Sequence, residues 1–177
     1  NIILAAAIAF EIGISTDSIR EGITSCEFIP GRYEIIPNQG SALIISDYGH
    51  TPDAYINVLQ SVKEMYHDKN IKVLFGAGGN RDKSKRSEMA KAIEFFAIQC
   101  YLAPDNPRFE KIDDINHEVI KGFSGKNYEV FNDRKKGLIA ALTDLSQNDI
   151  LIIFGKGNEE YQEINGEKMY YSDRKII

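Results

Sequence analysis

The sequence predicts an α/β fold in which a mostly parallel sheet is flanked by helices. From residue 33 onward, short runs of Ile, Leu, Val and Phe alternate with amphipathic stretches. The runs are apolar almost throughout, which is typical of strands that are buried on both faces. Strands that alternate with helices form βαβ units, and the strands of such units lie parallel.

The N-terminal segment is predicted to be helical and to belong to a preceding domain. Residues 1–12 carry an apolar helical pattern that ends at Gly13, and Ser15 or Thr16 can cap a second helix that runs to about residue 24. Residues 28–31, Phe-Ile-Pro-Gly, break this pattern. We therefore expect residues 1–29 to close one domain and residues 30–177 to form the next. The chain begins in mid-pattern without Met, so we expect a longer polypeptide.

The remaining elements follow from periodicity and from turn residues. In chain order we expect strands at 33–36 and 42–46, a helix at 52–65, a strand at 72–75, a helix at 85–97, a strand at 99–102, a helix at 112–121, a strand at 128–131, a helix at 135–145 and a strand at 150–154. Asn165-Gly166 lies between two further short strands, and this dipeptide is the strongest short signal for a β-hairpin. Ser172-Asp173 indicates the start of a last helix.

Composition narrows the function classes. The net charge of −5 argues against a nucleic-acid-binding protein. No apolar run is long enough to cross a membrane, and residues 1–10 lack the basic leader of a signal peptide. The two cysteines, Cys26 and Cys100, are too few for a disulfide framework, so we expect reduced, buried thiols in a cytoplasmic protein.

Four predicted strands end in unusually polar loops. These loops are residues 47–53, 76–86, 105–108 and 155–160. In an open α/β sheet, ligands bind beyond the carboxyl ends of the strands, and in a parallel sheet these four ends share one edge. That edge would bring arginines, lysines, acids and glycines together, which suits a zwitterionic ligand with several charges.

Arg108 is the most informative residue among these loops. It follows Asp105-Asn106-Pro107, a turn that fixes the direction of the side chain, and the guanidinium fork matches the geometry of a carboxylate. The alternative is a solvated arginine on a surface turn. Similarly, His50 is as well suited to forming hydrogen bonds with the backbone of its own turn as to binding a ligand. The glycines at 76–79 fit neither the dinucleotide fingerprint nor the phosphate loop.

Taken together, these motifs resemble the C-terminal part of the Mur ligase family. The motifs are Pro30-Gly31-Arg32, Asp47-Tyr48-Gly49-His50-Thr51-Pro52-Asp53, the run Gly78 to Arg86, Asp105-Asn106-Pro107-Arg108, and the run Gly155 to Gln162. Within the family, they resemble most the branch that adds the third amino acid to the peptidoglycan precursor. The order and spacing of the motifs fit from residue 1 to the end of the chain.

The resemblance implies a fold and an activity. Family members have three domains, and the last one is Rossmann-like. ATP phosphorylates the D-glutamyl carboxylate of UDP-MurNAc-dipeptide, the amine of an amino acid attacks the acyl phosphate, and phosphate leaves. ATP and Mg²⁺ bind mainly to the central domain, so we expect the chain to lack a complete catalytic set and a metal site, and to be inactive in isolation. We expect the full-length protein to be monomeric.

The resemblance also assigns residues. Asn1, Arg32, Asp47 and His50 match positions on the ATP side, and the amino-acid site would contain Arg81, Asp105, Asn106, Arg108, Gly155 and Glu159. Arginine at the fourth position of the Asp-Asn-Pro-Arg motif marks the members that take meso-diaminopimelate, because a bidentate arginine can bind the second carboxylate of this amino acid. Two positions depart from the family pattern, where Gly49 replaces alanine and Asn158 replaces histidine.

Several alternatives stay open at this point. One is a ligase of the same superfamily that adds L-lysine or another amino acid, such as a cyanophycin-synthetase-like or folylpolyglutamate-synthetase-like enzyme. A second is a non-catalytic nucleotide-binding module, although no acidic ribose-binding residue follows a proper glycine fingerprint. The last is a purely structural domain.

Overall fold

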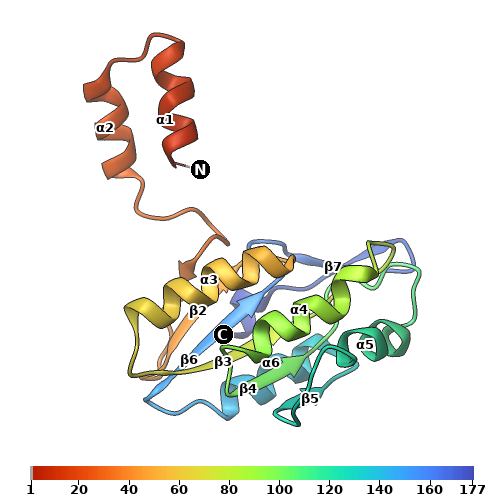
Figure 1. Cartoon of the computed structure of the whole chain (residues 1–177). Helices are drawn as coiled ribbons and strands as arrows, with labels where there is room; N and C mark the ends of the chain where they lie inside the picture. The colour runs from red at the N-terminus through yellow and green to blue at the C-terminus, as the bar shows by residue number, and fades with distance from the viewer. Residues whose placement is uncertain (1) are drawn as a thin grey trace.

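A six-stranded, mostly parallel sheet forms the centre of the molecule (Figure 1). The structure is a computed structural model that describes residues 2–177. The strands are β1 (Glu34–Ile35), β2 (Leu43–Asp47), β3 (Asn70–Phe75), β4 (Gln99–Leu102), β5 (Tyr128–Val130) and β6 (Asp149–Phe154), in the spatial order β1-β2-β6-β3-β4-β5. Only β1 runs antiparallel to its neighbour. The predicted α/β fold is confirmed.

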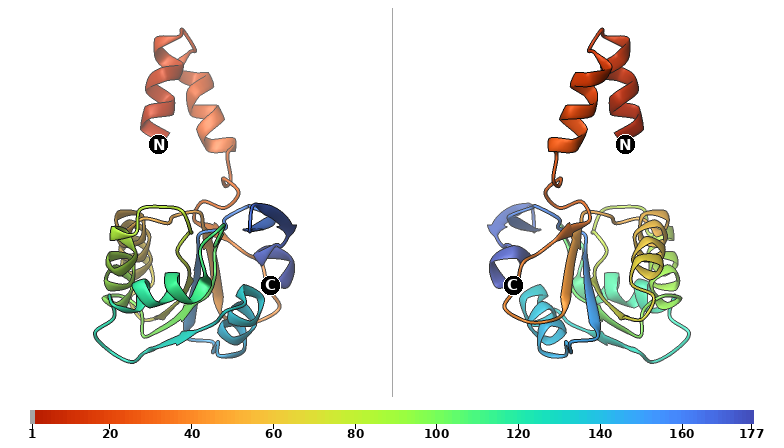
Figure 2. Two further views of the ribbon diagram at one scale, coloured as in Figure 1. Left: turned by 90° about the vertical axis from the view of Figure 1, so that its right-hand side faces the viewer. Right: turned by 90° about the vertical axis from the view of Figure 1, so that its left-hand side faces the viewer.

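Helices cover both faces of this sheet. Figure 2 shows α3 (Pro52–Met65), α4 (Ser84–Glu94) and α5 (Ile112–Ile120) on one face, and α6 (Arg134–Thr143) with α7 (Asp173–Ile176) on the other. Strand β6 explains the two layers, because all six of its residues are buried and successive side chains point to opposite faces. Ile152 packs in the core beneath α3, whereas Leu151 packs in the core beneath α6.

The register of the strands brings their carboxyl ends to one level. Asp47 at the end of β2 pairs with Phe154 at the end of β6, and Phe75 at the end of β3 pairs with Leu102 at the end of β4. Ile153 of β6 pairs in turn with Leu74 of β3. The four polar loops therefore leave the sheet side by side.

Two short helices precede the sheet and stand apart from it in all views (Figures 1 and 2). They are α1 (Ile2–Glu11) and α2 (Thr16–Ser25), and Ser15 caps α2 by accepting a hydrogen bond from Ser18 N at 3.2 Å. No residue of either helix is buried, although α1 is apolar on all sides. The predicted domain boundary near residue 29 stays a prediction.

The details correct one prediction and adjust the bounds of others. Cys100 is buried as expected, but Cys26 is exposed because it lies in the linker that follows α2. The predicted hairpin exists as β7 (Tyr161–Ile164) and β8 (Glu167–Tyr170), and the predicted helix at 85–97 ends earlier, at Glu94. No helix among residues 2–177 combines the length and apolar character that crossing a bilayer requires.

Candidate functional site

The four polar loops line one cavity of about 250 Å³ at the carboxyl ends of the strands. All six residues predicted for an amino-acid site line it: Arg81, Asp105, Asn106, Arg108, Gly155 and Glu159. His50 lines it as well, whereas Arg32 and Asp47 lie outside its walls. Asn1, the remaining predicted residue, lies outside the part of the chain that the structure describes.

Glycines allow two of these loops to touch backbone to backbone. Gly79 N donates a hydrogen bond to Asn106 O at 2.9 Å, and a Cβ on Gly79 would lie well within 3.0 Å of Pro107 O. A Cβ on Gly76 would likewise lie well within 3.0 Å of Ala103 O. The glycine run therefore serves close packing of the loop after β3 against the loop after β4, which only residues without a side chain permit.

A buried arginine fixes the glycine loop from below. Arg86 Nη2 donates to Gly78 O at 3.0 Å, and its guanidinium contacts both carboxylate oxygens of Glu110 at 3.0 Å. Glu110 also accepts a hydrogen bond from Asn80 N. Hydrogen bonding from Arg86, with help from Asn80, lowers the pKa of Glu110 to about 2. Arg86, Glu110 and Asn80 thus form a clip that holds the loop in place.

Arg108 has an unusual backbone conformation that the adjoining hairpin enforces. Its φ of +52° is in the left-handed region, which is unfavourable for arginine. Two hydrogen bonds to the hairpin hold it there, from Arg108 N to Glu163 O at 3.0 Å and from Asn165 N to Arg108 O at 2.7 Å. Strain of this kind occurs where a side chain has to point in one direction.

The side chain of Arg108 forms the positive end of the cavity together with Arg81. Arg108 Nη1 donates to Gly79 O at 2.8 Å, and its Nε lies 3.2 Å from Glu163 Oε2. A Cβ on Gly78 would lie 3.1 Å from Arg108 Nη1 and 3.4 Å from Arg81 Cγ, so both arginines pass beside Gly78. The contact with Glu163 shows that Arg108 is not a solvated surface arginine.

Asp105 and Glu159 form the acidic end of the same cavity, with Lys156 between them. Asn106 connects this end to the arginines, because its carbonyl oxygen accepts from Arg108 Nη1 at 3.4 Å and its Nδ2 donates to Glu159 Oε2 at 3.2 Å. Lys156 is fully buried, and its Nζ lies 2.5 Å from Asn106 Oδ1, 2.9 Å from the carbonyl oxygen of Tyr161, 3.3 Å from Asp105 Oδ1 and 3.4 Å from Glu159 Oε2. Burial lowers the pKa of Lys156, and the two carboxylates oppose that effect.

Sequence analysis did not select Lys156 or Tyr48 as site residues. The sequence did contain a signal for Lys156, which lies between two glycines directly after a wholly apolar strand. A lysine at such a position is close to the core, and a lysine is seldom fully buried unless it is paired. Tyr48 lies in a predicted site loop, and its hydroxyl donates to Glu159 Oε1 at 3.2 Å.

The residues predicted to contact ATP surround Tyr48. The Arg32 guanidinium lies 4.8 Å from the centre of the Tyr48 ring, and His50 meets the same ring edge-on at 4.9 Å. Asp47 is placed differently, because its carboxylate accepts hydrogen bonds from Tyr33 N at 2.9 Å and from Gly49 N at 2.6 Å. Asp47 is therefore committed to shaping the loop, whereas Arg32 and His50 are exposed.

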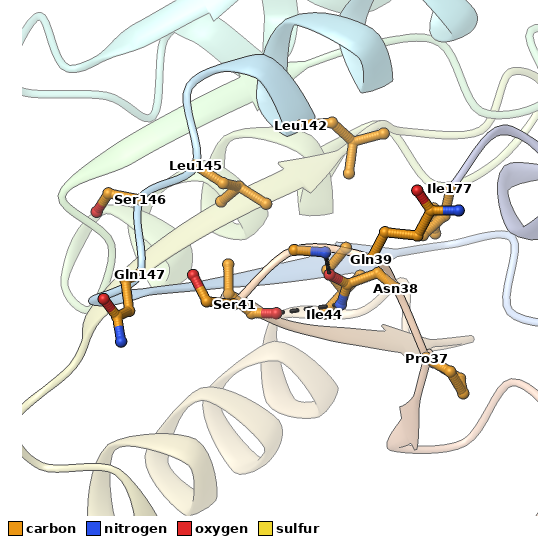
Figure 3. A pocket seen from close by; sticks show the side chains of 12 residues that line it. Pro37, Asn38, Gln39, Ser41, Ile44, Leu142, Leu145, Ser146, Gln147 and Ile177 are labelled. Carbon is orange, nitrogen blue, oxygen red and sulfur yellow. Dashed lines mark hydrogen bonds between the residues drawn. The ribbon is translucent and has the colours of Figure 1, made fainter.

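A larger hollow of about 830 Å³ lies at the opposite ends of the strands (Figure 3). It is formed by residues 37–42, by the end of α6 and by Ile177, and no ionisable side chain lines it. The charged cavity is thus the better candidate for a zwitterionic ligand. Within residues 2–177, no three His, Cys, Asp or Glu side chains gather in a way that would hold a metal ion.

Comparison with known proteins gives a consistent result. The family model described as "Mur ligase, glutamate ligase domain" matches residues 31–157. The UDP-N-acetylmuramoyl-L-alanyl-D-glutamate–2,6-diaminopimelate ligase of Aquifex aeolicus is 40% identical over 98% of this chain, and that of Bacillus cereus is 35% identical over 99%. In both cases the match covers 36% of the relative, so the chain spans about a third of the length of these curated proteins.

Solved structures extend the comparison. A structure of a ligase with the same name superposes with a TM-score of 0.77 at 32% identity, covering 98% of this chain and 36% of that one. A folylpolyglutamate synthase from Thermotoga maritima gives a TM-score of 0.60 at 20% identity, covering 86% of this chain and 33% of that one, which supports the fold alone. From the family model and the sequence identities, we conclude that the chain belongs to the Mur ligase family.

Proposed function

We propose that this chain is the C-terminal part of an ATP-dependent ligase that adds meso-diaminopimelate to UDP-MurNAc-L-Ala-D-Glu in the bacterial cytoplasm. The observation that carries the proposal is that one cavity is lined both by Arg81 and Arg108 and by the neighbouring acids Asp105 and Glu159. The names of the relatives from Aquifex aeolicus and Bacillus cereus support the same substrate.

The charges of diaminopimelate match those of the cavity. At each end of the molecule one carbon carries both a carboxylate and an amino group, so the distal carboxylate can meet the arginines while the distal ammonium beside it meets the neighbouring acids. L-Lysine has the same amino groups but lacks the distal carboxylate. With lysine, Arg108 would keep its contacts with Glu163 and Gly79 O but would gain no ligand carboxylate, so lysine would lack that interaction.

The chain contributes positioning and charge neutralisation to the proposed reaction. ATP supplies the phosphoryl group that activates the D-glutamyl carboxylate, and residues outside this chain would bind most of the nucleotide and its Mg²⁺. Arg32 and His50 suit an interaction with phosphate oxygens, because both are exposed and both contact Tyr48. Asp47 would act through the loop that it holds.

The domain organisation is part of the same proposal. Helix α1 is apolar on all sides, and none of its described residues is buried. A helix with this composition is stable in water only within a larger core. We therefore assign residues 1–29 to the end of the central domain and residues 30–177 to the amino-acid-binding domain.

Calorimetric titration of the chain with meso-diaminopimelate, L-lysine and NAD tests the substrate. We expect diaminopimelate to bind at least tenfold more tightly than lysine. The informative variant is Arg108→Asn, because asparagine tolerates the left-handed backbone at this position and so removes the guanidinium without adding backbone strain. This variant should lose at least tenfold in affinity for diaminopimelate and little for lysine.

The exposed Lys91→Met variant is the matched control, since it removes one positive charge far from the cavity. Tighter binding of lysine than of diaminopimelate would assign the chain to a ligase for another amino acid. Binding of NAD alone would instead support a non-catalytic nucleotide-binding module.

A further inference from the structure

We propose that Lys156 is a positioning residue that sets the charge of the acidic end of the cavity, so that Asp105 and Glu159 together accept a single ammonium group. This inference rests on the proposed function, because it concerns how the same cavity recognises the distal ammonium of its amino acid. It adds a residue that does not reach the cavity itself, since Lys156 is fully buried and is absent from the cavity walls.

The contacts of Lys156 join three separate parts of the site. Its ammonium group donates to Asn106 in the loop after β4 and to the carbonyl oxygen of Tyr161 at the start of β7. It also lies within 3.4 Å of Glu159, in its own loop. A neutral side chain of the same length would fill the space but would release all three contacts.

The contacts of Lys156 matter because they set the net charge of the acidic end of the cavity. Asp105 and Glu159 carry two negative charges, and Lys156 carries one positive charge, which leaves one charge for a ligand to neutralise. Two other buried cations lie near this site and both are already paired, Arg134 with Asp173 at 2.8 Å and Arg86 with Glu110 at 3.0 Å. Without Lys156, two carboxylates would face each other with no buried cation between them, and one of them would retain a proton.

Lys156 also determines the orientation of the Asn106 amide. Asn106 Oδ1 accepts from Lys156 Nζ at 2.5 Å and from Glu163 N at 2.9 Å, so that Nδ2 is left to donate to Glu159 Oε2 at 3.2 Å. The cation thereby fixes the orientation of the Asn106 amide and, through Nδ2, the hydrogen bond that Asn106 donates to Glu159.

Proton exchange on ligand binding distinguishes this role from simple packing. Calorimetric titration with meso-diaminopimelate at pH 7, in buffers with different ionisation enthalpies, counts the protons released. The wild-type chain should release close to none from the acidic end. Lys156→Met should release up to one more proton and bind about tenfold more weakly, because the ligand ammonium has to displace a proton that the carboxylates share.

A charge-matched variant completes the test. Lys156→Met combined with Glu159→Gln restores the balance of charge, so its proton count should return to the wild-type value. This double variant should also unfold at a higher temperature than Lys156→Met alone, which keeps the test decisive if the single variant is too unstable to titrate.

Two results would overturn the inference. One is a Lys156→Met variant with the wild-type proton count. The other is a double variant that is less stable than the single one, as expected if each side chain only fills space. Failure of the wild-type chain to bind diaminopimelate while it binds another amino acid would instead refute the proposed substrate, and the proton count could then be repeated with that amino acid.

Discussion

Replacement of Arg134 by Met should destabilise the chain by about 3–5 kcal/mol at pH 7. Arg134 in α6 is fully buried and makes two hydrogen bonds to Asp173 in α7, at 3.1 and 2.8 Å, and one to Phe154 O at 3.0 Å. The carboxylate of Asp173 outweighs the effect of burial and raises the pKa of Arg134, so the pair stays ionised. The pair anchors the C-terminal helix beneath the end of β6.

The magnitude follows from what happens to Asp173 when its partner is removed. Its side chain is 3% exposed, and its remaining donor would be the Tyr171 hydroxyl at 2.7 Å. The carboxylate can escape the cost of an unpaired buried charge by taking up a proton. Protonation at pH 7 of a group with an ordinary pKa near 3.9 costs about 4 kcal/mol, and this value limits the loss from Asp173. The unpaired carbonyl of Phe154 adds about 1 kcal/mol.

Urea unfolding followed by circular dichroism at pH 7 measures this loss of stability. Lys91→Met is the control, because its ion pair with Glu88 is more than half exposed and is worth at most about 0.5 kcal/mol. A loss below about 1 kcal/mol for Arg134→Met at pH 7 would refute the reasoning.

Two further predictions concern the glycine loop and its clip. Gly79→Ala should cost about 1–3 kcal/mol of stability and weaken diaminopimelate binding, because the new Cβ would collide with the backbone at Pro107. Gly22→Ala in α2 is the control and should be neutral or slightly stabilising, because nothing lies within 4 Å of its Cβ position. Equal effects of the two substitutions in thermal unfolding and in titration would contradict this prediction. Glu110, with its pKa lowered to about 2, stabilises the fold fully above its ordinary pKa near 4.5, and this contribution is lost as the pH falls toward 2. Glu110→Gln should therefore flatten the loss of stability in that pH range, and an unchanged acid-unfolding profile would argue against the clip.

Much of the fold could be predicted because its signals are local. The apolar run of β6 is hydrophobic enough to require burial on both faces, and Asn165-Gly166 favours the backbone angles of a tight hairpin. Alternation of strands and helices then leaves few arrangements other than a parallel sheet, and a parallel sheet places Arg108 and Glu159 at one edge. The sequence alone therefore determined the class of fold and the edge that carries the polar loops, whereas the six predicted residues that line the cavity came from the resemblance to a known family.

The tertiary structure decided how these residues are used. Lys156 became the centre of the acidic end through contacts with residues 50 and 51 positions away in the sequence, and Arg108 took a left-handed backbone because a hairpin about 55 positions later holds it. Asp47 turned its carboxylate to backbone amides rather than to the cavity. Propensity and periodicity describe a residue and its near neighbours, whereas the partner of a buried charge depends on strand register and loop packing, which exist only once the whole sheet has formed.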